Sequence, residues 1–132
     1  MILGLLESLQ DVLLIGFGAV IGVNIRLLIY NKLEKINVSK NLIILLINTF
    51  SSFCLGFYSS YLSRIGSLSY SYKFGLFFSI GLLGSLSTFS TFIYDLYDLI
   101  LQLKFYKAFE LCIISLTLGI VALAFGFSMA RQ

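Results

Sequence analysis

The stretch that most constrains this chain is residues 81–92, GLLGSLSTFSTF, which places polar side chains inside an apolar segment. It holds two glycines, five hydroxyl side chains and two phenylalanines, and the surrounding segment is long enough to cross a bilayer. Within lipid, a backbone N–H or C=O group without a partner costs several kcal/mol. Such a stretch is tolerated where it faces protein, water or an ion, so it indicates an ion or permeation site.

The composition of the chain indicates an integral membrane protein. Of its 132 residues, 59% are hydrophobic and 11% are charged, whereas a soluble domain carries about 25% charged residues. The length suits one domain, a four-helix transmembrane channel domain over residues 1–132. Because a span takes about 20 apolar residues, four spans with short loops account for the chain.

We expect an all-α protein with four transmembrane helices, at residues 12–30, 41–62, 74–103 and 107–129. The third segment is too long for one straight crossing. Its Gly, Ser and Thr residues predict two half-helices around a central break. Since the chain has no proline, we expect glycine and hydroxyl residues to make this break. The first segment lacks the positive n-region of a secretory signal, so we expect it to be retained.

Small residues recur at intervals of four positions in three of the expected spans. The pairs are Gly18–Gly22, Ser52–Gly56 and Ala122–Gly126. Pairs of this kind let helix backbones approach closely, so we expect them to be packing contacts.

Lysine and arginine divide unevenly between the two sides of the membrane. Three lie on the side of the N-terminus and six on the other: Arg64, Lys73 and Arg131 against Arg26, Lys32, Lys35, Lys40, Lys104 and Lys107. The positive-inside rule then predicts that both termini lie outside the cytoplasm. The net charge of +3 is small and lies mostly in loops, so nucleic acid is not expected as a partner.

Residues suited to catalysis are scarce. The chain has no histidine, and the acidic residues deep within an expected span are Asp95 and Asp98, three positions apart on one helical face. No nucleophile–base pair or metal-ligand spacing accompanies these carboxylates. We therefore do not expect an enzyme.

Two other polar side chains in apolar surroundings each have more than one interpretation. Arg26 ends the apolar part of the first span. It either snorkels to the interface, attracts an anion at a vestibule or clamps two subunits together. Asn48 lies in the middle of the second span, where its amide needs partners. It either makes an interhelical hydrogen bond or donates to an anion inside a pore.

Phe89 and Phe92 follow the polar stretch at a spacing of three, which places them on one face of a helix. The edge of an aromatic ring is positive, so it can stabilise a small anion without binding it tightly. Weak binding at several sites suits conduction, because the ion can leave again. Two phenylalanines at this spacing are usually core packing, but their position beside a polar break favours a pore.

Three ordered motifs resemble those of the CrcB/Fluc family of fluoride channels, which are small four-span proteins that work as antiparallel dimers. Residues 18–26, GAVIGVNIR, are similar to the family's GGxxGxxxR, and residues 81–92 are similar to GxxGGxTTFSTF. In the second span, Ile47-Asn48 with Phe53 and Gly56 is similar to VNxxGxFxxG. The resemblance covers most of the chain.

The resemblance implies a passive fluoride channel in a bacterial plasma membrane that exports F⁻ from the cytoplasm and reduces its toxicity. It implies a dual-topology antiparallel dimer embedded in membrane lipid. The implied ion pathway comprises Asn48, Phe89, Phe92, Thr88, Thr91, Ser115 and Arg26. Backbone carbonyls of Gly84 and Ser87 would coordinate a structural Na⁺ on the dimer axis, because exposed carbonyls at a helix break suit a hard cation.

The chain also departs from the family's pattern. Ser51 replaces a glycine, Ser85 the second glycine of a pair, Ile44 a frequent threonine and Leu111 a tyrosine. A protein that inserts in both orientations should have little Lys/Arg bias, yet this chain has three against six. A second interpretation is therefore one half of a heterodimer with a paralogue of opposite orientation, inactive alone.

Two other classes of membrane protein stay open. A small four-span multidrug-type transporter needs an ionisable carboxylate deep in the first span; Asp11 lies too near the start of the chain, and tryptophan is absent. A structural membrane subunit would use the polar break only as a packing device.

Overall fold

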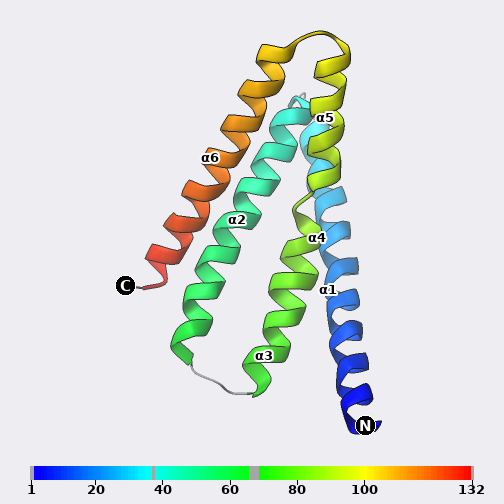
Figure 1. Cartoon of the computed structure of the whole chain (residues 1–132), viewed down its shortest axis with the longest axis vertical. Helices are drawn as coiled ribbons and strands as arrows, with labels where there is room; N and C mark the ends of the chain where they lie inside the picture. Colours follow the sequence, from blue (N-terminus) through cyan, green and yellow to red (C-terminus); the bar gives the residue numbers. More distant parts are fainter. Residues whose placement is uncertain (1, 37, 66–68, 132) are drawn as a thin grey trace.

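The computed structural model describes residues 2–36, 38–65 and 69–131, which are helical almost throughout (Figure 1). The elements are α1 (Ile2–Glu34), α2 (Lys40–Ile65), α3 (Ser69–Gly75), the π-helix η1 (Leu76–Leu83), α4 (Gly84–Leu86), α5 (Phe89–Leu101) and α6 (Phe105–Met129). In the described part of the chain, four helical segments are long and apolar enough to cross a membrane. They confirm the predicted all-α, four-span class, although α1 begins well before the expected residue 12.

The spans pack as two pairs that meet near the break. α2 packs along α6, whereas α1 packs along η1 and α4, and α5 continues the third crossing beside α6 (Figure 1). The buried core is small and joins α2 to the residues just before the break; it consists of Ile43, Ile47, Leu83 and Leu86. Most other large apolar side chains are exposed, as expected of a surface that faces hydrocarbon.

Glycines make both helix pairs possible. A side chain at Gly18 or Gly22 of α1 would collide with backbone carbonyl oxygens of η1. A side chain at Gly56 or Gly126 would likewise collide with a backbone carbonyl of the opposite helix in the α2–α6 pair. For these four glycines, the contacts confirm the prediction that small residues bring helix backbones together.

The third crossing is broken at Ser87 and Thr88, whose backbones are extended, with ψ of 145° and 116°. Gly84 keeps helical angles, with φ −63° and ψ −34°. Gly81 lies within η1, where a Cβ would lie 2.7 Å from the carbonyl oxygen of Ile15 on α1. The expected central break is confirmed and hydroxyl residues supply it, whereas both glycines of this stretch stay helical and Gly81 packs against α1.

The π-helix η1 is a feature that the sequence did not predict. It ends at Gly84, whose backbone N–H donates to the carbonyls of Ser79 and Gly81. π-Helical turns within α-helices occur frequently at functional sites. Here the wide turns pack against α1 and are separated from the break by the short helix α4.

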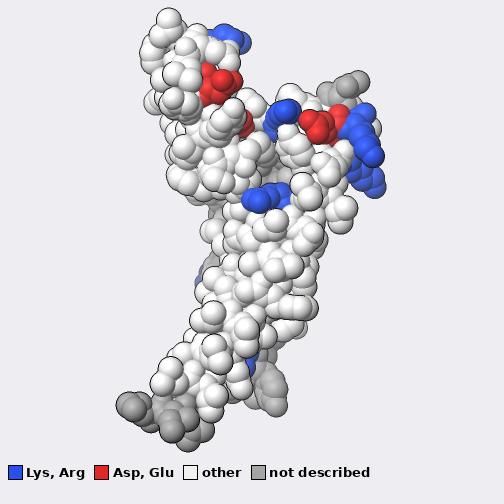
Figure 2. All heavy atoms as spheres, turned by 90° about the vertical axis from the view of Figure 1, so that its right-hand side faces the viewer, with Lys and Arg blue, Asp and Glu red and all other residues white. Residues whose placement is uncertain are grey.

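Most of the charged side chains on the face seen in Figure 2 gather at one end of the molecule, above a long stretch that shows little charge. That end carries the α1–α2 and α5–α6 connections in Figure 1. It is the side to which the sequence assigns six of the nine Lys and Arg residues.

Candidate ion pathway

Asn48 on α2 binds the break directly. The backbone N–H of Thr88 donates to Asn48 Oδ1 over 2.8 Å, and Asn48 Nδ2 donates to the Thr88 carbonyl over 3.2 Å. Thr88 is buried, with 5% of its surface exposed. One side-chain amide therefore satisfies both backbone groups of a residue that has left the helix, where lipid offers no alternative partner.

At the break, two backbone N–H groups bind side chains and not the carbonyls of Gly84 and Ser87. In a continuous α-helix, the N–H of Thr88 would donate to Gly84 and that of Thr91 to Ser87. Instead, the first donates to Asn48 and the second to Thr88 Oγ1, over 3.4 Å. The break thus removes the helical donor from both carbonyls to which the resemblance assigns a cation.

The oxygens around the break fit a hard cation of low charge. Among the described residues, no group of three or more His, Cys, Asp and Glu side chains lies close enough together to hold a metal ion. Neutral carbonyl and hydroxyl oxygens remain as the donors, and hard cations prefer oxygen ligands. Gly84 adds no side chain and is exposed at the surface of the subunit.

Thr88 also caps α5. Its hydroxyl accepts from the backbone N–H of Thr91, lies 2.9 Å from Thr91 Oγ1 and lies 3.3 Å from Ser90 Oγ. This is the N-cap geometry that satisfies the first unpaired N–H groups of a helix. Thr91 is therefore tied to the break through Thr88.

A groove of about 370 Å³ opens beside the break, between α2, α5 and α6. It gathers six of the residues to which the sequence assigned the pathway or the cation: Asn48, Ser87, Thr88, Phe89, Phe92 and Ser115. The rest of its lining includes the hydroxyl of Ser52 and apolar side chains of α6. The groove is thus a mostly apolar wall with a few convergent polar groups.

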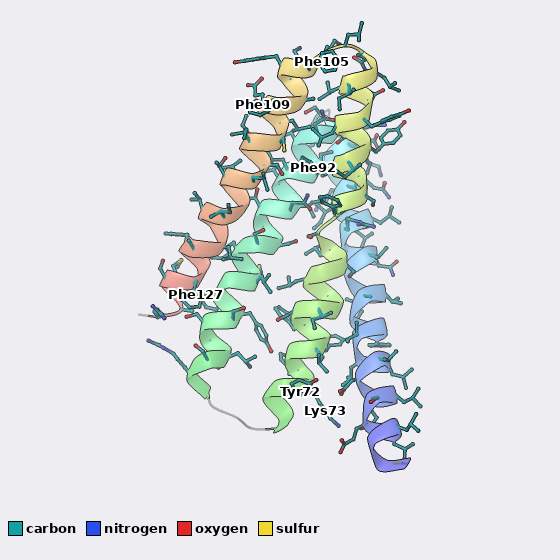
Figure 3. All side chains as sticks on the ribbon, in the orientation of Figure 1. Tyr72, Lys73, Phe92, Phe105, Phe109 and Phe127 are labelled. Atoms are coloured by element: carbon teal, nitrogen blue, oxygen red, sulfur yellow. The ribbon has the colours of Figure 1, made fainter. Side chains whose placement is uncertain are left out.

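Phe89 and Phe92 lie on the same side of α5, as their spacing predicts. Their ring centroids are 6.2 Å apart and their planes differ by 43°. Phe92 is labelled in Figure 3, on α5 next to the break. Phe89 leaves 73% of its surface exposed. Phe89 therefore does not pack in the core of this subunit, and its role in a pathway stays a prediction.

The remaining predicted residues lie outside the groove. Arg26 is half-buried on α1 and is not part of the groove lining. Gly84 lines a smaller neighbouring pocket, which also contains Ser51 and Ser79. The sequence did not predict an ion-site role for Ser52 or Ser79. The position of Ser52, four residues after Asn48 on the same helical face, was the signal that could have identified it.

Comparison with known proteins gives two matches. The family model described as CrcB-like protein, Camphor Resistance (CrcB), matches residues 13–127. The chain is also similar to a curated protein of Prochlorococcus marinus (strain NATL2A) named Fluoride-specific ion channel FluC 2. The two are 49% identical over 124 residues, which cover 94% of this chain and 100% of that protein. Residues 13–127 include the groove, the break and the smaller pocket.

Proposed function

The chain belongs to the CrcB-like protein family, and on this premise we propose that it is a subunit of a fluoride channel. The name of its Prochlorococcus relative supports a channel for fluoride rather than an enzyme. The observation that carries the proposal is the groove beside the break, where an amide, several hydroxyls and two phenylalanine rings converge. Such a lining offers hydrogen-bond donors to an anion without a fixed positive charge to trap it.

Asn48 is the main donor to the anion in this proposal. An amide NH₂ group has two N–H donors, and the Thr88 carbonyl takes one of them. The second N–H is available to F⁻ in the groove that Asn48 lines. The same side chain would therefore hold the break open and bind the ion.

Phe89 and Phe92 continue the pathway from the amide. The positive edges of their rings stabilise an anion weakly. A path made of several weak sites lets an ion enter and leave again, as conduction requires. Ser115, on α6, adds a hydroxyl to the same groove.

Passive transport is sufficient for export. Neutral HF crosses lipid and dissociates at cytoplasmic pH, so F⁻ accumulates inside the cell. A membrane potential of 100 mV, negative inside, favours exit of one negative charge by about 2.3 kcal/mol. A channel in the plasma membrane therefore lowers cytoplasmic fluoride without an energy source.

The working unit in this proposal is an antiparallel dimer with Na⁺ at its centre. The exposed ring of Phe89 is a surface that a second subunit would cover. Two subunits would bring four carbonyls together, from Gly84 and Ser87 of each, around one structural Na⁺.

A heterodimer is the second candidate, supported by the charge distribution. The Lys and Arg count is three against six, which favours one fixed orientation in the membrane. The number in the relative's name, FluC 2, suggests a paralogue pair in that organism. Ile44 is buried and adds no hydroxyl where the family often has threonine.

Reconstitution in liposomes tests these proposals with a fluoride electrode. We expect F⁻ efflux from liposomes that contain this chain alone. Efflux only after a paralogue of opposite orientation is added would support the heterodimer. Absence of efflux in both cases would contradict the channel and favour a structural subunit.

Replacing the rings tests the pathway itself. Phe89→Ile and Phe92→Ile should each reduce F⁻ efflux at least about tenfold, which corresponds to about 1.4 kcal/mol in the barrier. Phe109→Ile is the matched control, because Phe109 is an exposed phenylalanine of α6 outside the groove (Figure 3). Unchanged efflux in the Phe89 and Phe92 variants would refute the role of the rings.

A further inference from the structure

A second, smaller pocket lies between α2, η1 and the break. Its volume is about 90 Å³, and its lining is Ser51, Ser52, Leu55, Ser79, Leu83, Gly84 and Ser87. Four of these seven residues are serines, and Ser52 and Ser87 also line the larger groove. The pocket therefore lies beside the proposed ion pathway and shares two lining residues with it.

Ser51 lines this pocket with a hydroxyl whose proton is used within its own helix. The residue is 3% exposed, and its hydroxyl donates to the carbonyl of Ile47 in its own helix over 2.8 Å. A hydroxyl has one donor and two acceptor lone pairs. Since the proton is used within the helix, the lone pairs of the oxygen are what Ser51 offers to a ligand. An anion gains nothing there, whereas a cation or a water molecule does.

Gly84 and Ser87 provide acceptors at the same pocket. Their carbonyls have lost the N–H groups of Thr88 and Thr91 to Asn48 and to the Thr88 hydroxyl. Oxygens without charge cannot offset the desolvation of a divalent ion well, which favours a monovalent one. A water molecule occupies about 30 Å³ of liquid, so the pocket has room for a small cation with one or two waters.

We propose that Ser51 supplies a further oxygen ligand to the cation at the break. Its hydroxyl oxygen holds Na⁺, directly or through one water, from inside the subunit, while the carbonyls of Gly84 and Ser87 hold it from the break. The inference rests on the proposed Na⁺ of the channel. It adds an oxygen that the family motif lacks, because Ser51 stands where that motif has glycine.

Thermal unfolding of the purified full chain in detergent tests the role of Ser51. The NaCl concentration is varied at constant ionic strength, with N-methylglucamine chloride as the replacement salt. An ion that binds only the folded protein raises the midpoint of unfolding. We expect Na⁺ to raise it in the native protein, and Ser51→Ala to need about tenfold more Na⁺ for the same rise.

Ser63→Ala is the matched control. Ser63 lies on the same helix and donates to the carbonyl of Ser60 over 2.7 Å, but it is outside the pocket. Its variant should keep the Na⁺ dependence of the native protein. Ser51→Gly serves as a second variant should Ser51→Ala fold poorly, and it should lose Na⁺ affinity to a similar extent.

The outcomes separate this inference from the channel proposal. Equal Na⁺ dependence in the native protein and both Ser51 variants would overturn it. So would a uniform drop in the midpoint at every Na⁺ concentration, or no stabilisation of the native protein by Na⁺. Fluoride efflux from Na⁺-containing liposomes is measured separately, and only its absence contradicts the channel.

Discussion

Two regions of this molecule use small residues in opposite ways. In the contact between α1 and η1, Gly18 and Gly22 leave no room for a side chain, and each helix backbone satisfies itself. At the break, Ser87 and Thr88 abandon the helix, and hydrogen bonds from side chains replace the helical ones. The first region is a close packing contact between two helices, whereas the second lines a groove.

The difference shows why only the second region can serve an ion. Lipid provides no partner for an unpaired backbone group. Two helices whose backbone groups are hydrogen-bonded internally therefore need only complementary surfaces to pack together. The break depends on a particular amide, that of Asn48, placed by a neighbouring helix. Because the N–H groups at the break bind side chains instead, the carbonyls of Gly84 and Ser87 lack their helical donors. These carbonyls are the groups that a cation can use.

Removal of the Asn48 amide should have the largest effect. Asn48→Ala leaves the N–H of buried Thr88 without a partner, which costs about 1–3 kcal/mol, and it also removes the donor from Asn48 to the Thr88 carbonyl. We expect a marked fall in the midpoint of thermal unfolding and loss of F⁻ efflux. Asn24→Ala is the control, because the exposed Asn24 amide donates to Val20 of its own helix. Similar stability of the two variants would show that the break does not depend on Asn48.

Filling the glycine contact should have the next largest effect. A methyl group at Gly22 would collide with the Leu82 carbonyl and Ser85 Oγ, so Gly22→Ala must push α1 away from η1. Overpacking of this kind costs about 1–3 kcal/mol. Gly16→Ala is the matched control on the same helix, since nothing lies within 4 Å of the added atom. If both variants unfold at the same temperature, the contact is looser than the structure indicates.

Loss of the α5 cap should have the smallest effect. Thr88→Val removes the hydroxyl that accepts from Thr91 but keeps the backbone groups bound by Asn48. A lost N-cap costs about 1 kcal/mol. Thr88→Ser should stay close to the native stability, measured by thermal unfolding. Thr117→Val is the control, because its hydroxyl bonds only to carbonyls of its own helix. A larger loss for Thr117→Val would contradict the capping role.

The sequence by itself determined the features that are local. Apolar runs of sufficient length predicted the spans, because the thickness of hydrocarbon sets the length of a crossing helix. The strip of residues 81–92 predicted a break, because a polar stretch within lipid needs partners. The spacing of Phe89 and Phe92 predicted a shared face, because helical periodicity fixes it.

Only the tertiary structure decided the features that join distant parts of the chain. Asn48 and Thr88 are 40 residues apart, and their hydrogen bonds follow from how α2 packs against the third crossing. That packing places the break at Ser87 and Thr88 and keeps Gly81 and Gly84 helical. It also gathers Ser51 and Ser79 behind the break and leaves Arg26 outside the groove. The sequence shows which polar groups lie in apolar segments and need partners, but only the packing of helices determines which partners they have.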